Sequence, residues 1–173
     1  MTPNGRRALV TVVGAVALVV GGFVLFESAM RRFEASAATA LLHLAGAHNA
    51  QVFFGNSIQV YPTAHEPFRA VVTPSCSCIA SLLALTALWL LSPRRDARRL
   101  AALPVALAVV TAGNILRIAA SIAVGLVAGR ASLVLFHDWV GTVFTFAYTL
   151  GGYVLMLYVL LPRRAGGDDV VAA

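Results

Sequence analysis

Three side chains that can do chemistry interrupt or border the apolar runs of this chain: Cys76, Arg117 and His137. A cysteine thiolate is a nucleophile, and an imidazole moves protons near neutral pH. A guanidinium stabilises a negatively charged oxygen or clamps a substrate. A site that held all three would suit acyl transfer, in which the cysteine attacks a carbonyl carbon.

Cys76 lies where a polar, strand-like segment gives way to an apolar run. The plainer interpretation is a small buried hydrophobe, the usual fate of a free cysteine. At the outer end of a helix, however, unpartnered backbone N–H groups and the helix dipole lower a thiol pKa, and the same N–H groups could hold an oxyanion. Cys78, beyond Ser77, lies roughly 200° round a helix and faces elsewhere. A Cys76–Cys78 disulfide would be strained in a helix, although a loop could hold one.

Arg117 lies inside the apolar run at 101–128, where a guanidinium costs at least about 2.5–3.5 kcal/mol. Asn114 and Ser121 share its helix face. The plainer interpretation is an arginine that snorkels to lipid phosphates, but its distance from the outer end of the run makes that awkward. We therefore expect Arg117 to face a cavity or a partner.

His137 precedes the apolar run at 139–161 and could simply be an interfacial histidine beside an aromatic residue. Its predicted depth matches that of Cys76, which favours a role in proton transfer. Gly141, one turn on, would let a neighbouring helix or a substrate backbone approach closely. Asp138 could orient His137 or point to solvent. The remaining histidines lie in less rigid segments and rank lower: His43, His48 and His65.

The composition is that of a membrane protein. Hydrophobic residues make up 60% of the 173 residues and charged residues 12%, against roughly 45–50% and 25% in soluble domains. Four apolar runs approach the length of ~20 residues that a span needs. We therefore predict an all-α integral membrane protein with four transmembrane helices, at 8–26, 75–92, 101–128 and 139–161. The first could instead be a cleaved signal peptide, but its length and the charges that follow favour an uncleaved helix.

Two segments between the first two spans have a different character. Residues 27–47 predict an amphipathic helix at the membrane interface, with an apolar face of Phe33, Ala37, Ala40, Leu41 and Leu44. Residues 51–54 and 57–61 flank Gly55 and Asn56 and predict a small extracytoplasmic hairpin, followed by another short strand from Phe68. We treat 1–164 as one membrane-embedded domain and 165–173 as a flexible tail.

The arginines predict the topology. Four spans place eight arginines on one side and four on the other, and cytoplasmic loops carry the excess. The first group is Arg6, Arg7, Arg94, Arg95, Arg98, Arg99, Arg163 and Arg164, and the second is Arg31, Arg32, Arg69 and Arg130. The protein is then a multi-pass protein of the plasma membrane with both termini in the cytoplasm. Cys76 and His137 lie on the extracytoplasmic side. The net charge of +6 reflects this placement at the ends of apolar runs, so we expect no nucleic-acid partner.

Taken in order, these residues resemble the exosortase/archaeosortase family of membrane transpeptidases over roughly residues 49–161. That family has a cysteine at the outer start of a helix, an Asn-x-x-Arg in a later helix and a His-x-x-x-Gly opening the next. The corresponding residues here are Cys76-Ser77-Cys78, Asn114 to Arg117, and His137 to Gly141. Cys78 replaces the usual glycine, and the chain has fewer spans than many relatives.

The resemblance implies an activity and a partner. Such enzymes are thought to cleave a C-terminal sorting signal, made of a short motif, a transmembrane helix and basic residues, from an exported protein. They then pass the acyl group to an acceptor, which is unknown here. The implied roles are nucleophile for Cys76, transition-state or substrate stabiliser for Arg117 and proton carrier for His137, supported by Asn114, Gly141, Ser77 and Cys78.

Two other functions stay open at the level of sequence. A membrane thiol–disulfide oxidoreductase would need both Cys76 and Cys78, whereas the transpeptidase needs only Cys76. A non-enzymatic membrane scaffold would need neither cysteine, but it leaves the intramembrane Arg117 without a role. Two cysteines in C-x-C spacing match no zinc site, and we expect no metal and no cofactor. The expected partners are the exported protein, membrane lipid and the unknown acyl acceptor.

Overall fold

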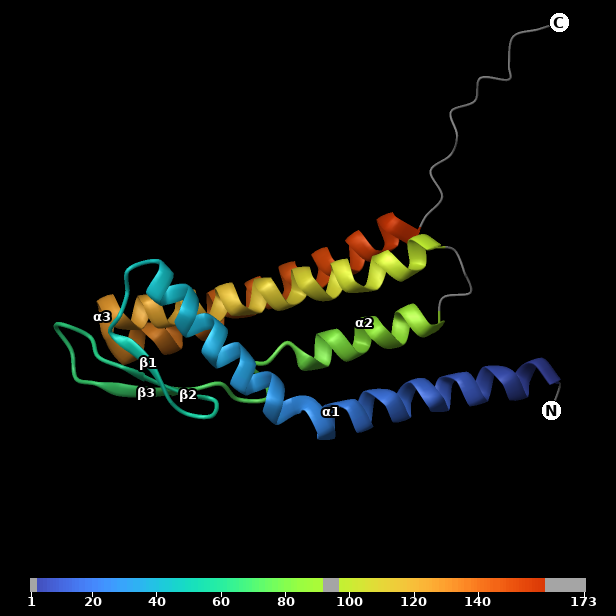
Figure 1. The fold of residues 1–173 in the computed structure, drawn as a ribbon, viewed down its shortest axis with the longest axis horizontal. Coiled ribbons are helices and arrows are strands. Elements are labelled where there is room, and N and C mark those ends of the chain that lie inside the picture. Colours follow the sequence, from blue (N-terminus) through green and yellow to red (C-terminus); the bar gives the residue numbers. More distant parts are fainter. Residues whose placement is uncertain (1–2, 92–96, 161–173) are drawn as a thin grey trace, which may run out of the picture.

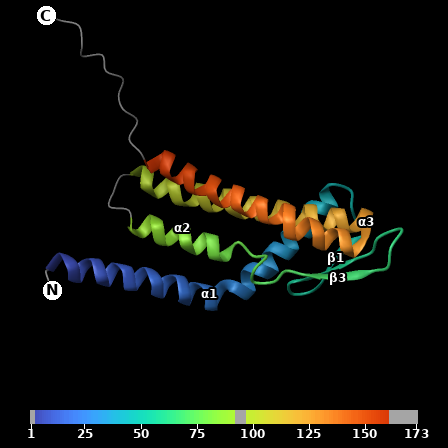
Figure 2. The same ribbon diagram turned by 180° about the vertical axis from the view of Figure 1, so that it is seen from behind.

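The computed structural model describes residues 3–91 and 97–160 and is mostly helical, with one small sheet. The helices are α1 (Pro3–Leu44), α2 (Ile79–Leu91) and α3 (Ala97–Leu160), and the strands are β1 (Ala50–Phe54), β2 (Ser57–Val60) and β3 (Phe68–Val71). The helices run along the long axis of the molecule, and the sheet lies at one end (Figure 1). The first turn of α1 and the last turn of α3 both lie toward the other end, on opposite sides of α2, and Figure 2 shows the same arrangement from behind.

Helix α3 folds back on itself at Gly129. This residue has φ 79° and ψ 179°, a conformation that glycine adopts without strain. The two halves pack closely side by side. A Cβ on Gly113 would lie 2.6 Å from the Tyr148 side chain, and one on Gly152 would lie 2.7 Å from the Val110 side chain. The segment between the predicted spans 101–128 and 139–161 is therefore helical beyond Gly129. His137 lies inside the second half of α3 rather than ahead of it.

Helix α1 joins the predicted first span and the predicted amphipathic segment into one continuous helix. Phe33 and Leu44 of the predicted apolar face are 53% and 86% exposed, as on a helix face that would meet the membrane interface, and that placement stays a prediction. The buried face consists of Glu34, Ala35, Ala38, Thr39 and Leu42. Small residues let α1 approach the sheet and α3 closely, and the bulky side chains point outward instead.

The sheet has the order β1-β2-β3, and both strand pairs are antiparallel. The predicted hairpin is confirmed: Gly55, at φ 53°, and Asn56 connect β1 to β2. The predicted third strand from Phe68 is confirmed as well. Ile58, Val60 and Phe68 pack with the small residues of α1 and with Ile118 and Ile122 of α3. This core holds the sheet against the helices directly beside the segment that carries Cys76.

Helix α2 begins at Ile79 and has 13 residues, so the predicted span at 75–92 starts too early. At a rise of 1.5 Å per residue, α2 is about 20 Å long, against about 30 Å of hydrocarbon in a bilayer. Within residues 3–91 and 97–160, two helical stretches are long and apolar enough to cross a membrane by length and composition, Leu9–Leu44 and Leu100–Leu160. The predicted span ends at 92 and 161 and the predicted tail at 165–173 lie outside the described residues.

Candidate active site

Nε2 of His137 is the meeting point of the three predicted site residues. It lies 3.1 Å from Sγ of Cys76 and 3.2 Å from Nη2 of Arg117. The three side chains come from the turn before α2 and from the two halves of α3, so the fold at Gly129 brings Arg117 and His137 together. A guanidinium can only donate, so Nε2 carries no proton while it accepts from Arg117, and in that form it can take the proton of the thiol. After the transfer, the Nε2–H group donates to the thiolate and stabilises it.

Cys76 lies in a tight turn and not on the helix. Its own N–H and that of Ser77 both donate to the carbonyl oxygen of Thr73, at 3.0 and 3.2 Å. The next two N–H groups are also bonded, Cys78 N to Glu34 Oε1 at 2.9 Å and Ile79 N to Ser77 Oγ at 3.3 Å. The four N–H groups from Cys76 to Ile79 are therefore engaged, so the expected free N–H groups are not found at these four positions. Arg117 is then a candidate donor for an oxyanion.

The surroundings of the Cys76 thiol favour its ionised form. Partial burial opposes ionisation, but hydrogen bonds to the side chains of His137 and Thr73 outweigh it and lower the pKa of Cys76 to about 7. Oγ1 of Thr73 lies 2.9 Å from Sγ, and its backbone carbonyl holds the turn. Cys76 is partly exposed, so the nucleophile is both ionisable and accessible.

Arg117 is 6% exposed, and its Nε has no hydrogen-bond partner among the described residues. A Cβ at Gly141 would lie 2.7 Å from this Nε and 3.2 Å from Nη2. The absence of a side chain at Gly141 therefore makes the space that the guanidinium occupies. The predicted close approach at Gly141 is made by this side chain, from the facing half of α3.

A buried polar network holds the turn of Cys76 in place. Oε1 of Glu34, a fully buried residue, accepts hydrogen bonds from Cys78 N at 2.9 Å and from Asn114 Nδ2 at 2.8 Å. Asn114 Nδ2 also donates to the carbonyl oxygen of Cys76 at 3.0 Å, and Tyr148 Oη donates to Asn114 Oδ1 at 2.9 Å. Residues from α1 and from both halves of α3 thus fix the backbone on either side of the thiol.

Glu34 is the residue of this network that sequence reasoning missed. It sits among charged neighbours in a segment that was expected to lie at the membrane interface, where a carboxylate usually faces water. The available signal was the spacing of small residues around it, at Ala35 and Ala38, which mark a close helix contact.

Cys78 is a different kind of thiol from Cys76. It is 2% exposed, and burial together with the nearby Glu34 carboxylate raises the pKa of its thiol well above the ordinary range. A buried, protonated thiol is a poor nucleophile. Both cysteines are free in this structure.

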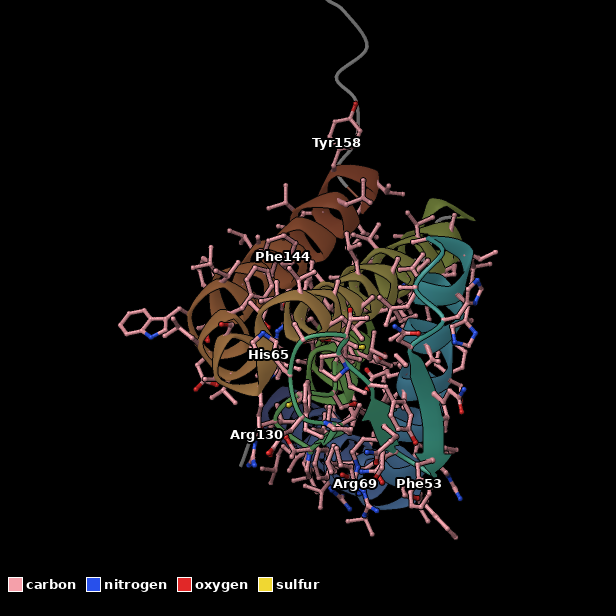
Figure 3. The ribbon with its side chains drawn as sticks, turned by 90° about the vertical axis from the view of Figure 1, so that its left-hand side faces the viewer. Phe53, His65, Arg69, Arg130, Phe144 and Tyr158 are labelled. Carbon is pink, nitrogen blue, oxygen red and sulfur yellow. The ribbon has the colours of Figure 1, made fainter. Side chains whose placement is uncertain are left out.

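A cavity of about 210 Å³ opens beside Cys76 and His137. Most of its wall is apolar and comes from the sheet and the first half of α3, including Phe68, Ile118 and Ile122. Arg69 and Arg130 also line it. In Figure 3 they lie on the same side of the molecule, and the Arg69 guanidinium stands 4.8 Å from the ring centre of Phe53.

The other predicted candidates lie outside this cluster. His43 Nε2 is 2.7 Å from the carbonyl oxygen of Ala50, and its ring centroid lies 5.3 Å from that of His48. The His65 ring packs against Gly129, where a Cβ would lie 3.1 Å from Cγ of His65. Asp138 is exposed, as expected of a residue that points to solvent.

A family model, that of the transmembrane exosortase (Exosortase_EpsH), matches residues 5–158. No curated protein and no solved structure matches the chain. The match covers every residue of the cluster and most of the chain, so the resemblance drawn from the three motifs is confirmed.

Proposed function

Because the chain belongs to the transmembrane exosortase family, we propose that it is a cysteine transpeptidase or protease that cleaves the C-terminal sorting signals of exported proteins. The observation that carries this proposal is the position of His137 Nε2, 3.1 Å from the Cys76 thiol and 3.2 Å from Arg117. A nucleophile and a base in hydrogen-bond contact, with a cation beside them, are the parts that acyl transfer needs.

The reaction begins when Nε2 of His137 takes the proton of Cys76 and Sγ attacks the scissile carbonyl carbon. A bond forms between sulfur and carbon, and the carbonyl oxygen becomes an oxyanion. Collapse of this intermediate breaks the carbon–nitrogen bond, and His137 gives its proton to the departing amine. The remaining thioester is then attacked by an acceptor nucleophile or by water, which releases Cys76.

Arg117 is the oxyanion stabiliser in this proposal. Once Nε2 of His137 is protonated it can no longer accept from Arg117, so the Nη2 donor becomes free when the oxyanion forms. The unpartnered Nε adds a second donor on the same side chain. Such donors act most strongly in a site from which water is excluded, and Arg117 is 6% exposed.

We infer a topology of four spans with both termini in the cytoplasm. The two halves of α3, the first part of α1 and the shorter α2 supply the spans, and the arginine count orients them. The sheet end of the molecule is then outside the plasma membrane, with Cys76 and His137 at the outer face.

The substrate in this proposal is an exported protein that ends in a short motif, an apolar helix and basic residues. The membrane would hold this helix beside the enzyme and so raise the local concentration of the motif at Cys76. The thiol–disulfide alternative is weaker, because Cys78 is buried and its thiol pKa is raised.

Co-expression with candidate exported proteins of this kind tests the proposal. We expect each true substrate to lose the mass of its C-terminal helix and basic tail only in cells that make the active enzyme. Surface proteins that remain full length in the presence of the enzyme, across all candidates with such a tail, would count against the proposed activity.

A further inference from the structure

The outer edge of β3 is open and leads to Cys76. In an antiparallel pair, alternate residues direct their backbone N–H and C=O groups to the partner strand. Val72 N donates to Asn56 O at 2.9 Å and Ala70 pairs with Ile58, so these alternate residues face β2. The backbone groups of Arg69 and Val71 therefore point away from the sheet.

These outward groups have no partner in the described part of the chain, where no backbone or side-chain hydrogen bond reaches the outer edge of β3. The opposite edge of the sheet differs, because α1 packs against β1 and His43 bonds the carbonyl oxygen of Ala50. An open strand edge is a template for an extended peptide. β3 is thus the edge that is available for pairing.

The cavity beside the nucleophile begins along this same strand. Its wall includes four successive residues of this segment, at 69–72, and it ends at Cys76 and His137. A peptide added to β3 would direct alternate side chains to opposite faces. One set would face the cavity, whose apolar wall includes Phe68 and Leu133.

We propose that β3 is the docking strand for the substrate. The extended segment of the exported protein that carries the scissile bond adds to the outer edge of β3, and an apolar side chain of that segment fills the cavity. This inference rests on the proposed function and says how that substrate is held. The occupant is a substrate and not a second copy of the chain, because this edge continues into the cavity that holds the nucleophile.

Proline substitutions on the two edges of the sheet test this inference. Val71→Pro removes one outward N–H of β3 and leaves the pairing with β2 intact, since edge strands tolerate proline at such positions. Arg69→Pro removes the other. Val52→Pro is the matched control. The backbone groups of Gln51 in β1 face β2, so the N–H of the next residue, Val52, points outward on the opposite edge of the sheet. The full chain is used in membranes, with a co-expressed substrate that the wild type processes.

Two readouts separate docking from folding: substrate processing, and alkylation of Cys76 by iodoacetamide. We expect Val71→Pro and Arg69→Pro to slow processing at least about tenfold, with alkylation changed less than about twofold. Val52→Pro should leave both unchanged. A β3 proline variant that also loses alkylation has disturbed the turn that holds Cys76. The processing rate of the other β3 variant then tests the docking inference.

Processing at the wild-type rate by β3 proline variants that keep normal alkylation would overturn the docking inference and leave the proposed function standing. An equal loss in Val52→Pro would overturn it too, because the effect would then not belong to the β3 edge. A wild-type enzyme that processes no candidate substrate would overturn the proposed function, and the docking inference with it.

Discussion

Sγ of Cys76 lies 3.1 Å from Nε2 of His137, although the two residues stand 61 positions apart in the chain. The contact depends on two backbone features. The Thr73 carbonyl holds the thiol in a turn just before α2, and Gly129 reverses α3 so that His137 returns to the same depth. The pairing is a property of the fold, and it makes the reactivity of Cys76 a direct probe of the site.

The first prediction concerns the pH dependence of that reactivity. The pKa of Cys76 is lowered to about 7, so the reactive thiolate is present above pH 7 and is lost as the pH falls below it. The alkylation rate of Cys76 should rise with a midpoint near pH 7. Replacing His137 by Ala removes the largest stabilising contact and should move the midpoint toward about 8.5, which slows alkylation at pH 7 about tenfold. An unchanged midpoint in His137→Ala would show that the imidazole does not tune the thiol.

The second prediction concerns the space around Arg117. A Cβ at Gly141 would lie 2.7 Å from its Nε, so Gly141→Ala must displace the guanidinium. We expect substrate processing to fall about tenfold to a hundredfold, because a small misplacement of a catalytic group is costly. Gly151→Ala is the matched control on the same half of α3, since a Cβ there meets nothing within 4 Å. Equal activity of the two variants would remove the steric argument for Gly141.

The third prediction concerns the buried carboxylate of Glu34. Glu34→Ala leaves the Cys78 N–H and the Asn114 amide without their acceptor, which should cost about 2 kcal/mol and lower Tm by roughly 5 °C. Glu34→Gln keeps an acceptor oxygen and should lose less. Thermal unfolding in detergent measures both, with the exposed Glu66→Ala as the control. A Glu34→Ala protein as stable as this control would mean that the network does not hold the turn.

The fourth prediction distinguishes the two thiols. Cys78 is 2% exposed, so iodoacetamide should modify Cys76 alone in the folded protein and both cysteines only after denaturation. Peptide mass analysis of the alkylated chain reads out each position, and Cys78→Ala should be alkylated at the wild-type rate. Rapid modification of Cys78 in the folded protein would reopen the thiol–disulfide alternative.

Part of this arrangement was predictable from the sequence because polar residues in apolar runs are costly and therefore conspicuous. The positions of Cys76, Arg117 and His137 in or beside apolar runs indicate a site, and the Gly55-Asn56 pair predicts the turn of the hairpin. The contact between Arg117 and His137 depends on the reversal of α3 at Gly129. Residues 130–138 continue as helix after this reversal, so the local sequence pattern does not predict it.

Glu34 shows why the remainder was out of reach. A carboxylate on the polar side of an interfacial amphipathic helix is expected to face water. In this helix the bulky Phe33 is exposed, and the small residues beside Glu34 are buried with it against the rest of the fold. Hydrophobicity and burial separate in this way when a helix can expose apolar side chains to lipid.

The most direct test of the central claim compares Cys76→Ala with Cys78→Ala in one processing assay, using a co-expressed substrate and following its size. The account predicts full-length, unprocessed substrate with Cys76→Ala and normal processing with Cys78→Ala, both proteins being present in the membrane at wild-type levels. Processing that persists in Cys76→Ala would contradict the account.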